Sequence, residues 1–186
     1  GRASAQGQMR VQSTSSDVTV QDSLAAREAL EIEAARAILV ETDARIVSEA
    51  ALALQAGTGV TLGENAELAA VSDLAVDAGT GDAVLGASAR ILSHGNVGVQ
   101  AQNITAQNGA LMLAGMPQNG ASQDALLSLQ ATDTITLSGA QAASGGDIAA
   151  DARIIAIAAQ GELPAGRFVA QGDISIATQQ LTATGG

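Results

Sequence analysis

The sequence lacks cysteine, tryptophan, tyrosine and lysine, and Phe168 is its only aromatic residue. Without cysteine, neither a disulfide framework nor a cysteine zinc site can form. Without aromatic rings, the stacking that binds bases or sugars is almost excluded. Eight arginines stand against 19 acidic residues, giving a net charge of −11, which argues against nucleic acid and anionic lipid as partners. No run of apolar residues is long enough to insert in a membrane as a helix.

What the chain does have is a short repeated pattern, apolar–any–apolar, usually followed two residues later by alanine. The pattern begins at Met9, Leu30, Leu52, Leu74, Val97, Leu127, Ile148 and Ile174. The successive spacings are 21, 22, 22, 23, 30, 21 and 26 residues. A repeat of nearly constant length indicates a solenoid, in which each unit packs on its neighbours.

Each unit contains two further short apolar segments. The second segment holds Val18/Val20, Ile38/Val40, Val60/Leu62, Val84, Ile104 and Ile135/Leu137, and the third holds Leu24, Ile46, Leu68, Ile91 and Leu111/Leu113. Three period-2 segments separated by Gly, Asn, Asp or Ser indicate three short strands. We therefore predict an all-β fold: a right-handed parallel β-helix, a three-sided solenoid of roughly eight coils with about 22 residues per coil.

The two longest units contain the only prolines of the chain, Pro117 and Pro164. Because proline cannot donate a hydrogen bond to a central strand ladder, we predict loop insertions near 115–123 and 160–167. The sequence begins and ends without the features of a natural terminus. We expect residues 1–186 to be a single β-helical repeat segment, a fragment of a longer shaft.

One region allows a different fold. Residues 22–36 have a composition that favours an amphipathic helix. The alternation at Leu30-Glu31-Ile32 and the 22-residue spacing to Leu52 favour strands instead. We predict strands through residues 22–56.

The tracts Gly145-Gly146-Asp147-Ile148 and Gly172-Asp173-Ile174 resemble a recurring phrase of the filamentous haemagglutinin-like exoproteins of two-partner secretion in Gram-negative bacteria. The resemblance extends from about residue 9 to 182. It implies a structural shaft segment of a secreted or surface-exposed adhesin that projects a distal binding module. It also implies an outer-membrane β-barrel secretion partner, a receptor on a host or neighbouring cell, and end-to-end contact with further coils. The alternative within this resemblance is the stalk of a toxin-delivery exoprotein.

His94 is the only histidine, and it lies in a Ser-His-Gly-Asn turn. A catalytic triad would need it beside Ser93 or Ser88 and beside Asp73 or Asp77. No nucleophile-elbow motif accompanies it, so a solvated turn histidine is expected.

Paired carboxylates could act as acid and base on a glycosidic bond, and the acids that come nearest to such a cluster are Asp73, Asp77 and Asp82, with Glu64 and Glu67 one coil earlier. A sugar cleft without aromatic residues is unfavourable, so a polysaccharide-degrading enzyme is the weakest alternative. We expect no enzyme, no catalytic residue and no cofactor. The Gly-Gly-Asp turn at 145–147 lacks the rest of the repeated calcium-binding pattern, so we expect no metal site.

A tripeptide recurs at Ala44-Arg45-Ile46, Ala89-Arg90-Ile91 and Ala152-Arg153-Ile154. A row of outward arginines could bind an anion. We expect the three copies to fall at different positions around the coil, with each arginine paired to a nearby acid such as Asp43, Glu49 or Asp151. The threonines at 132, 134 and 136 form one cluster, and we expect no threonine column with one residue per coil.

Overall fold

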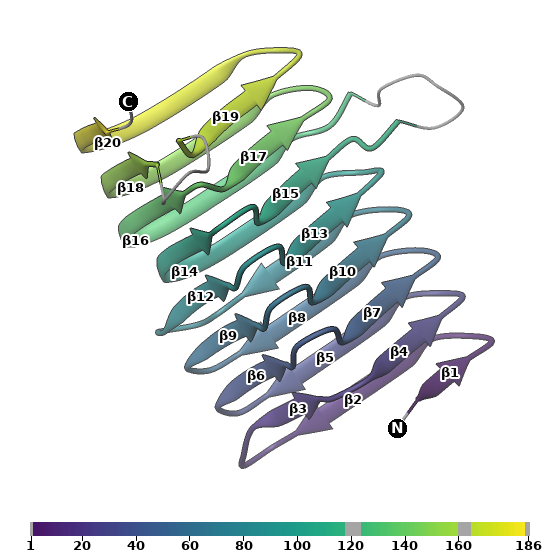
Figure 1. Cartoon of the computed structure of the whole chain (residues 1–186). Helices are drawn as coiled ribbons and strands as arrows, with labels where there is room; N and C mark the ends of the chain where they lie inside the picture. The colour runs from purple at the N-terminus through teal and green to yellow at the C-terminus, as the bar shows by residue number, and fades with distance from the viewer. Residues whose placement is uncertain (1, 118–123, 160–164, 185–186) are drawn as a thin grey trace.

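The computed structural model describes residues 2–117, 124–159 and 165–184, which form strands and turns without any helix (Figure 1). Every strand pairing is parallel, and each strand between the two end coils pairs with strands of the coils before and after it. The result is a β-solenoid of about eight coils, with the two ends of the chain at opposite ends of the stack. The predicted fold is confirmed.

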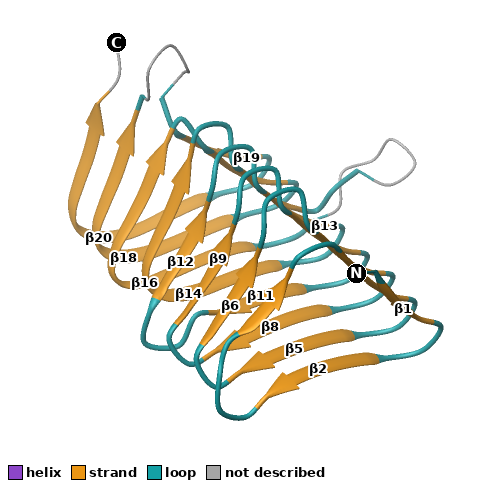
Figure 2. Cartoon of the chain, turned by 60° about the horizontal axis from the view of Figure 1, so that its bottom comes forward, coloured by secondary structure: helices purple, strands orange, loops and turns teal. Residues whose placement is uncertain are grey.

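Each coil contributes strands to three sides of the solenoid (Figure 2). One side is an eight-stranded sheet: β1 (Ala3–Ala5), β4 (Ser23–Ala26), β7 (Arg45–Ser48), β10 (Glu67–Ala70), β13 (Arg90–Ser93), β15 (Leu111–Ala114), β17 (Gln141–Ser144) and β19 (Arg167–Ala170). The other two sides belong to one twelve-stranded sheet. It contains β2 (Met9–Ser13), β3 (Val18–Val20), β5 (Leu30–Ala34), β6 (Ala37–Val40), β8 (Leu52–Ala56), β9 (Gly59–Leu62), β11 (Leu74–Asp77), β12 (Asp82–Leu85), β14 (Val97–Gln107), β16 (Leu127–Ser138), β18 (Ile148–Ala158) and β20 (Ile174–Thr184).

The two sides of the larger sheet join at a bend. In the first four coils a turn separates the two strands of each coil. In the fifth, β14 runs through the bend as one strand of 11 residues and pairs with both β11 and β12. A register shift between Ala101 and Asn103 marks the place where β14 turns the corner against β16. Such an irregularity bends a strand without ending it.

Residues at equivalent positions of successive coils are paired one to one, and we call such a set a file. One file is Met9, Leu30, Leu52, Leu74, Val97, Leu127, Ile148 and Ile174. These are the eight repeat positions predicted from the sequence. The spacing of the pattern therefore gives the register of the coils.

The core is a narrow column of stacked aliphatic side chains. Ile32, Ile38 and Ile46 are fully buried within a single coil, one on each side of the solenoid. At the corner before the eight-stranded sheet, five successive coils place an alanine inward: Ala44, Ala66, Ala89, Ala110 and Ala140, all at most 2% exposed. Branched side chains fill the sides of the triangle, and alanine fits where two sides converge.

In two strands, β12 and β15, the residues that the sequence pattern suggested as inward actually face outward, and their immediate neighbours face the core. Val84 is half-buried on the outside, whereas Ala83 and Leu85 face the core at 1% exposure. Likewise Met112 is the fully buried residue of β15, and Leu111 and Leu113 lie outside it. Both strands are apolar at consecutive positions, so no alternation reveals which side is buried.

The helical alternative for residues 22–36 is wrong, and the strands predicted through residues 22–56 are confirmed. That region contains five strands, β4 to β8, and its inward positions are buried. Tertiary stacking here overrides helix propensity. The two predicted loop insertions lie largely outside the described residues, at 118–123 and 160–164; Pro117 is exposed just before the first.

Met112 and Leu113 test the phase of β15 directly. Met112→Ala removes a fully buried side chain and should lower the free energy of unfolding by about 2–5 kcal/mol. Leu113→Ala removes an outward side chain and should cost about 1 kcal/mol or less. Urea unfolding of dilute protein, followed by far-ultraviolet circular dichroism, measures both. A larger loss for Leu113→Ala would contradict the register of this strand.

Candidate functional site

An outward polar file follows the first side of the twelve-stranded sheet. It consists of Gln12, Glu33, Gln55, Asp77, Gln100, Gln130 and Asp151, and it ends at Ala177 in the last coil. Three open hollows of about 430, 170 and 350 Å³ lie along it, one near each end and one at the middle. Amide and carboxylate groups thus recur once per coil along one line of the surface.

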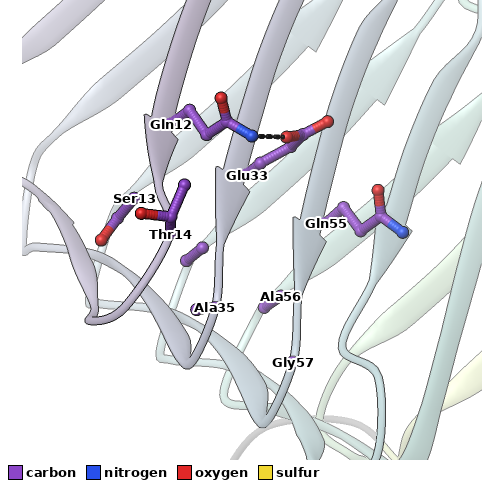
Figure 3. Close-up of a pocket in the computed structure, with 9 residues that line it drawn as sticks. Gln12, Ser13, Thr14, Glu33, Ala35, Gln55, Ala56 and Gly57 are labelled. Carbon is purple, nitrogen blue, oxygen red and sulfur yellow. Dashed lines mark hydrogen bonds between the residues drawn. The ribbon is translucent and has the colours of Figure 1, made fainter.

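The largest hollow is lined by Gln12, Glu33 and Gln55 on the strands, and by Ser, Thr, Ala and Gly residues at the strand ends and in the turns that follow (Figure 3). Glu33 is the centre of its polar contacts. It accepts hydrogen bonds from Arg10 Nη2 at 2.7 and 2.8 Å and from Gln12 Nε2 at 2.7 Å. The bond from Arg10 holds the pKa of Glu33 below its usual range, and the same contact raises the pKa of Arg10. The hollow can offer hydrogen bonds, but its carboxylate is already engaged with Arg10, and the hydroxyl of Ser13 at its edge lies 3.0 Å from that of Ser16.

His94 and its proposed partners do not assemble into a triad. The ring atom Nδ1 of His94 lies 3.1 Å from the carbonyl oxygen of Met116. Ser93 points into the core, where its hydroxyl donates to the carbonyl of Ser72. Asp73 Oδ1 accepts the amide of Asn96 in the next coil. Each group has a partner other than the histidine.

The remaining acids that could have formed a paired-carboxylate site are also dispersed. Asp77 accepts the amide of Gly79 at 2.8 Å, and Asp82 accepts Asn103 Nδ2 at 2.8 Å. Glu67 accepts Arg45 Nε at 2.7 Å on a different side of the solenoid. Glu64 is exposed on a turn. Among the residues described, no three His, Asp or Glu side chains gather closely enough to hold a metal ion.

Asp147 bonds a backbone amide, as single turn aspartates commonly do, but the amide belongs to the next coil. Its Oδ1 accepts the N–H of Asp173 at 2.8 Å. Asp73 and Asn96 make the same bond in earlier coils, the second to the amide of Leu126 at 2.8 Å. These side chains link successive coils at one corner.

The expectation that the three Ala-Arg-Ile arginines fall at different positions is wrong for two of them. Arg45 and Arg90 are both in register with Glu67, so they share one outward file of the eight-stranded sheet. Arg153 lies elsewhere, in β18, where its Nε donates to Asp133 Oδ1 at 2.8 Å. The acids that pair with Arg45 and Arg153 come from neighbouring coils rather than from nearby sequence.

A file rich in threonine exists, although it does not carry one threonine in every coil, in agreement with the sequence analysis. It runs along the outside of the third side: Thr19, Leu39, Thr61, Val84, Thr105, Thr136, Ala156 and Thr182. Leucine, valine and alanine interrupt it. The file was missed because its members are spaced by coil lengths that vary.

Sequence reasoning also missed three buried serines that share one inward file. The file alternates: Ala26, Ser48, Ala70, Ser93, Ala114 and Ser144. Each serine hydroxyl donates to a carbonyl of the preceding coil, as Ser144 does to Ala125 at 2.6 Å, and accepts an amide of its own turn. Serine at every second coil, about 45 to 51 residues apart, is the signal that could have revealed them.

Comparison with known proteins identifies no relative. No protein-family model matches the chain, and neither the curated proteins nor the solved structures contain a match. Within the described residues there is no helix long and apolar enough to cross a membrane.

Ser144 gives a test of the corner bonds. Ser144→Ala leaves the carbonyl of Ala125 and the amide of Gly146 without their buried partner, so unfolding free energy should fall by about 1–3 kcal/mol. Ser128→Ala is the matched control, because Ser128 points outward from β16 and should change stability by about 0.5 kcal/mol or less. Equal effects in urea unfolding would argue against a structural role for the buried hydroxyl.

Glu33 gives a test of the charged contact beside the largest hollow. Because its pKa is lowered in the folded state, its ion pair stabilises the fold above the pKa of the unfolded chain, and this contribution is lost as pH falls through the lowered value. Glu33→Gln should therefore lower Tm at neutral pH, and the difference should shrink and then vanish as pH falls through the lowered pKa of Glu33. A Tm difference that stays constant across this range would contradict the assignment.

Proposed function

We propose that this chain is a structural shaft segment of a large secreted or surface-exposed bacterial protein, and that it holds a distal binding module away from the cell. The observation that carries the proposal is the unbroken stack of parallel pairings from β1 to β20. Each coil adds about 4.8 Å, so eight coils span about 38 Å. A solenoid of this kind can be lengthened by adding coils, because each coil contacts only its neighbours.

The polar side chains support a mechanical role. Asp73, Asn96 and Asp147 bond the next coil, and the buried serines bond the preceding one. Arg45 and Arg153 pair with acids of adjacent coils. Among the side chains that could have supplied chemistry, Asp73, Asp82 and Glu67 bond to neighbouring coils, which is the arrangement a shaft needs.

The composition suits export through an outer-membrane β-barrel partner. A chain without cysteine cannot form disulfide loops in an oxidising compartment before it passes a pore. Coils that each pack on the one before can then fold one after another outside the cell. The net charge of −11 keeps such a rod soluble.

Localisation on intact cells tests the proposal. An antibody raised against the 186-residue chain should label intact bacteria that encode it, and brief treatment of the cells with an external protease should remove the signal. A cytoplasmic protein of the same cells, probed in parallel, should be labelled only after lysis. Labelling of this chain only in lysed cells would overturn the proposal.

A further inference from the structure

The outer face of the eight-stranded sheet is unusually apolar for a surface. Its central outward file is Ser4, Ala25, Val47, Ala69, Leu92, Leu113, Ala143 and Val169. Val169 is 42% exposed, Val47, Leu92 and Leu113 are half-buried, and Ala143, between Leu113 and Val169, is only 6% exposed. The equivalent file of the polar side contains only amides and acids from Gln12 to Asp151. Parallel sheets are normally covered on both faces, and an exposed apolar stripe of this length marks a contact surface.

The charges beside this stripe differ from those of the whole molecule. The adjacent outward file is Arg2, Ser23, Arg45, Glu67, Arg90, Leu111, Gln141 and Arg167, in which Glu67 is the only acid. Glu67 bonds Arg45 at 2.7 Å, and Arg90 forms no ion pair with any described residue. On a chain of net charge −11, this is a face that a second, equally acidic copy can approach without opposing carboxylates.

We propose that two copies of this chain pair through the outer face of the eight-stranded sheet, around a two-fold axis that passes between β10 and β13. The sheet order is β1-β4-β7-β10-β13-β15-β17-β19, so this axis lies at its middle and brings all eight strands of each copy into the contact. The two solenoids then run in opposite directions. An isologous two-fold contact is the commonest form of self-association.

The same axis brings complementary side chains of the two copies opposite each other. It places Glu67 of one copy opposite Arg90 of the other, twice. In the central file it places Ala69 opposite Leu92, so that a small residue faces a large one. The next pair outward is Val47 with Leu113. Like charges meet only at the two ends, where Arg2 faces Arg167 and Arg2 is already held near Asp22.

The area of the outer face indicates how tightly the two copies should bind. Four residues at about 3.3 Å and eight strands at about 4.8 Å give a face of about 13 by 38 Å, or about 500 Å² per copy. This is less than the roughly 800 Å² per partner of a standard stable interface. The dimer should therefore be weak, with dissociation at micromolar concentrations or above. The pairing does not depend on the proposed role as a shaft.

Sedimentation velocity of the full chain over a concentration series, at moderate salt, tests the pairing. The wild type should shift from monomer to dimer. Leu92→Glu, which places an unpaired charge opposite Ala69 in both copies, should raise the dissociation constant at least tenfold. Val84→Glu is the matched control: it puts the same residue on another outward file and should leave dimerisation unchanged. The dichroism spectrum and Tm of each variant establish that it is folded.

A charge exchange distinguishes this geometry from a general apolar contact. Arg90→Glu should weaken the dimer at least fivefold, because Glu67 would then face a glutamate. The double variant E67R/R90E should restore at least half of the lost affinity, because the crossed pairs are re-formed with reversed sign. Dimerisation that Arg90→Glu weakens and the double variant does not restore would overturn the proposed axis.

Two other results would overturn the proposal as a whole. One is a wild type that stays monomeric up to the highest soluble concentration. The other is association that continues beyond the dimer, is abolished by Ile176→Arg in the exposed strand β20, and is indifferent to Leu92→Glu. That result would show that the copies stack end to end through their terminal coils instead.

Discussion

The structure depends on one constraint: each coil must present the same kind of residue at the same place as the coils on either side of it. Backbone hydrogen bonds between coils impose it, because they pair residues one to one along β5, β8 and β11 and leave no freedom of register. A one-residue slip would turn every inward side chain outward. The repeated apolar pattern and the alanine corners are both consequences of this pairing.

The polar side chains obey the same constraint and reinforce it. Partners such as Asp147 and the amide of Asp173, or Arg45 and Glu67, are 26 and 22 residues apart in sequence but one coil apart in space. Individually such exposed bonds contribute little. The buried serines contribute more, because an unsatisfied carbonyl in the core would be costly. Stability is thus distributed over every interface between coils, which leaves the polar residues little opportunity to converge on one site.

The features that recur in every coil could be predicted from the sequence. Which residues of one particular strand face inward could not always be predicted. The file from Met9 to Ile174 was correct at all eight positions because apolar–any–apolar specifies both spacing and phase. The phase of β15 was wrong because Leu111, Met112 and Leu113 are all apolar, so either face could be buried. The acidic partners of Arg45 and Arg153 were also missed. Each partner lies one coil away, so it can be identified only when the exact register between neighbouring coils is known.

Strand β15 is apolar on its outward face as well as on its inward face. A strand with one buried and one solvent-exposed face normally alternates apolar and polar residues. In β15 such an alternation would have identified Met112 as the inward residue. Leu111 and Leu113 remain apolar although they face outward, as do Val47 and Leu92 in the same sheet. Solvation alone does not favour such residues on a chain that elsewhere places glutamine, aspartate and threonine on its surface. Leu39 and Val84 are also apolar and outward on the third side, but each lies between two threonines in its file. The central file of the eight-stranded sheet is apolar without interruption from Ala25 to Val169, which is what an interface on that face would produce.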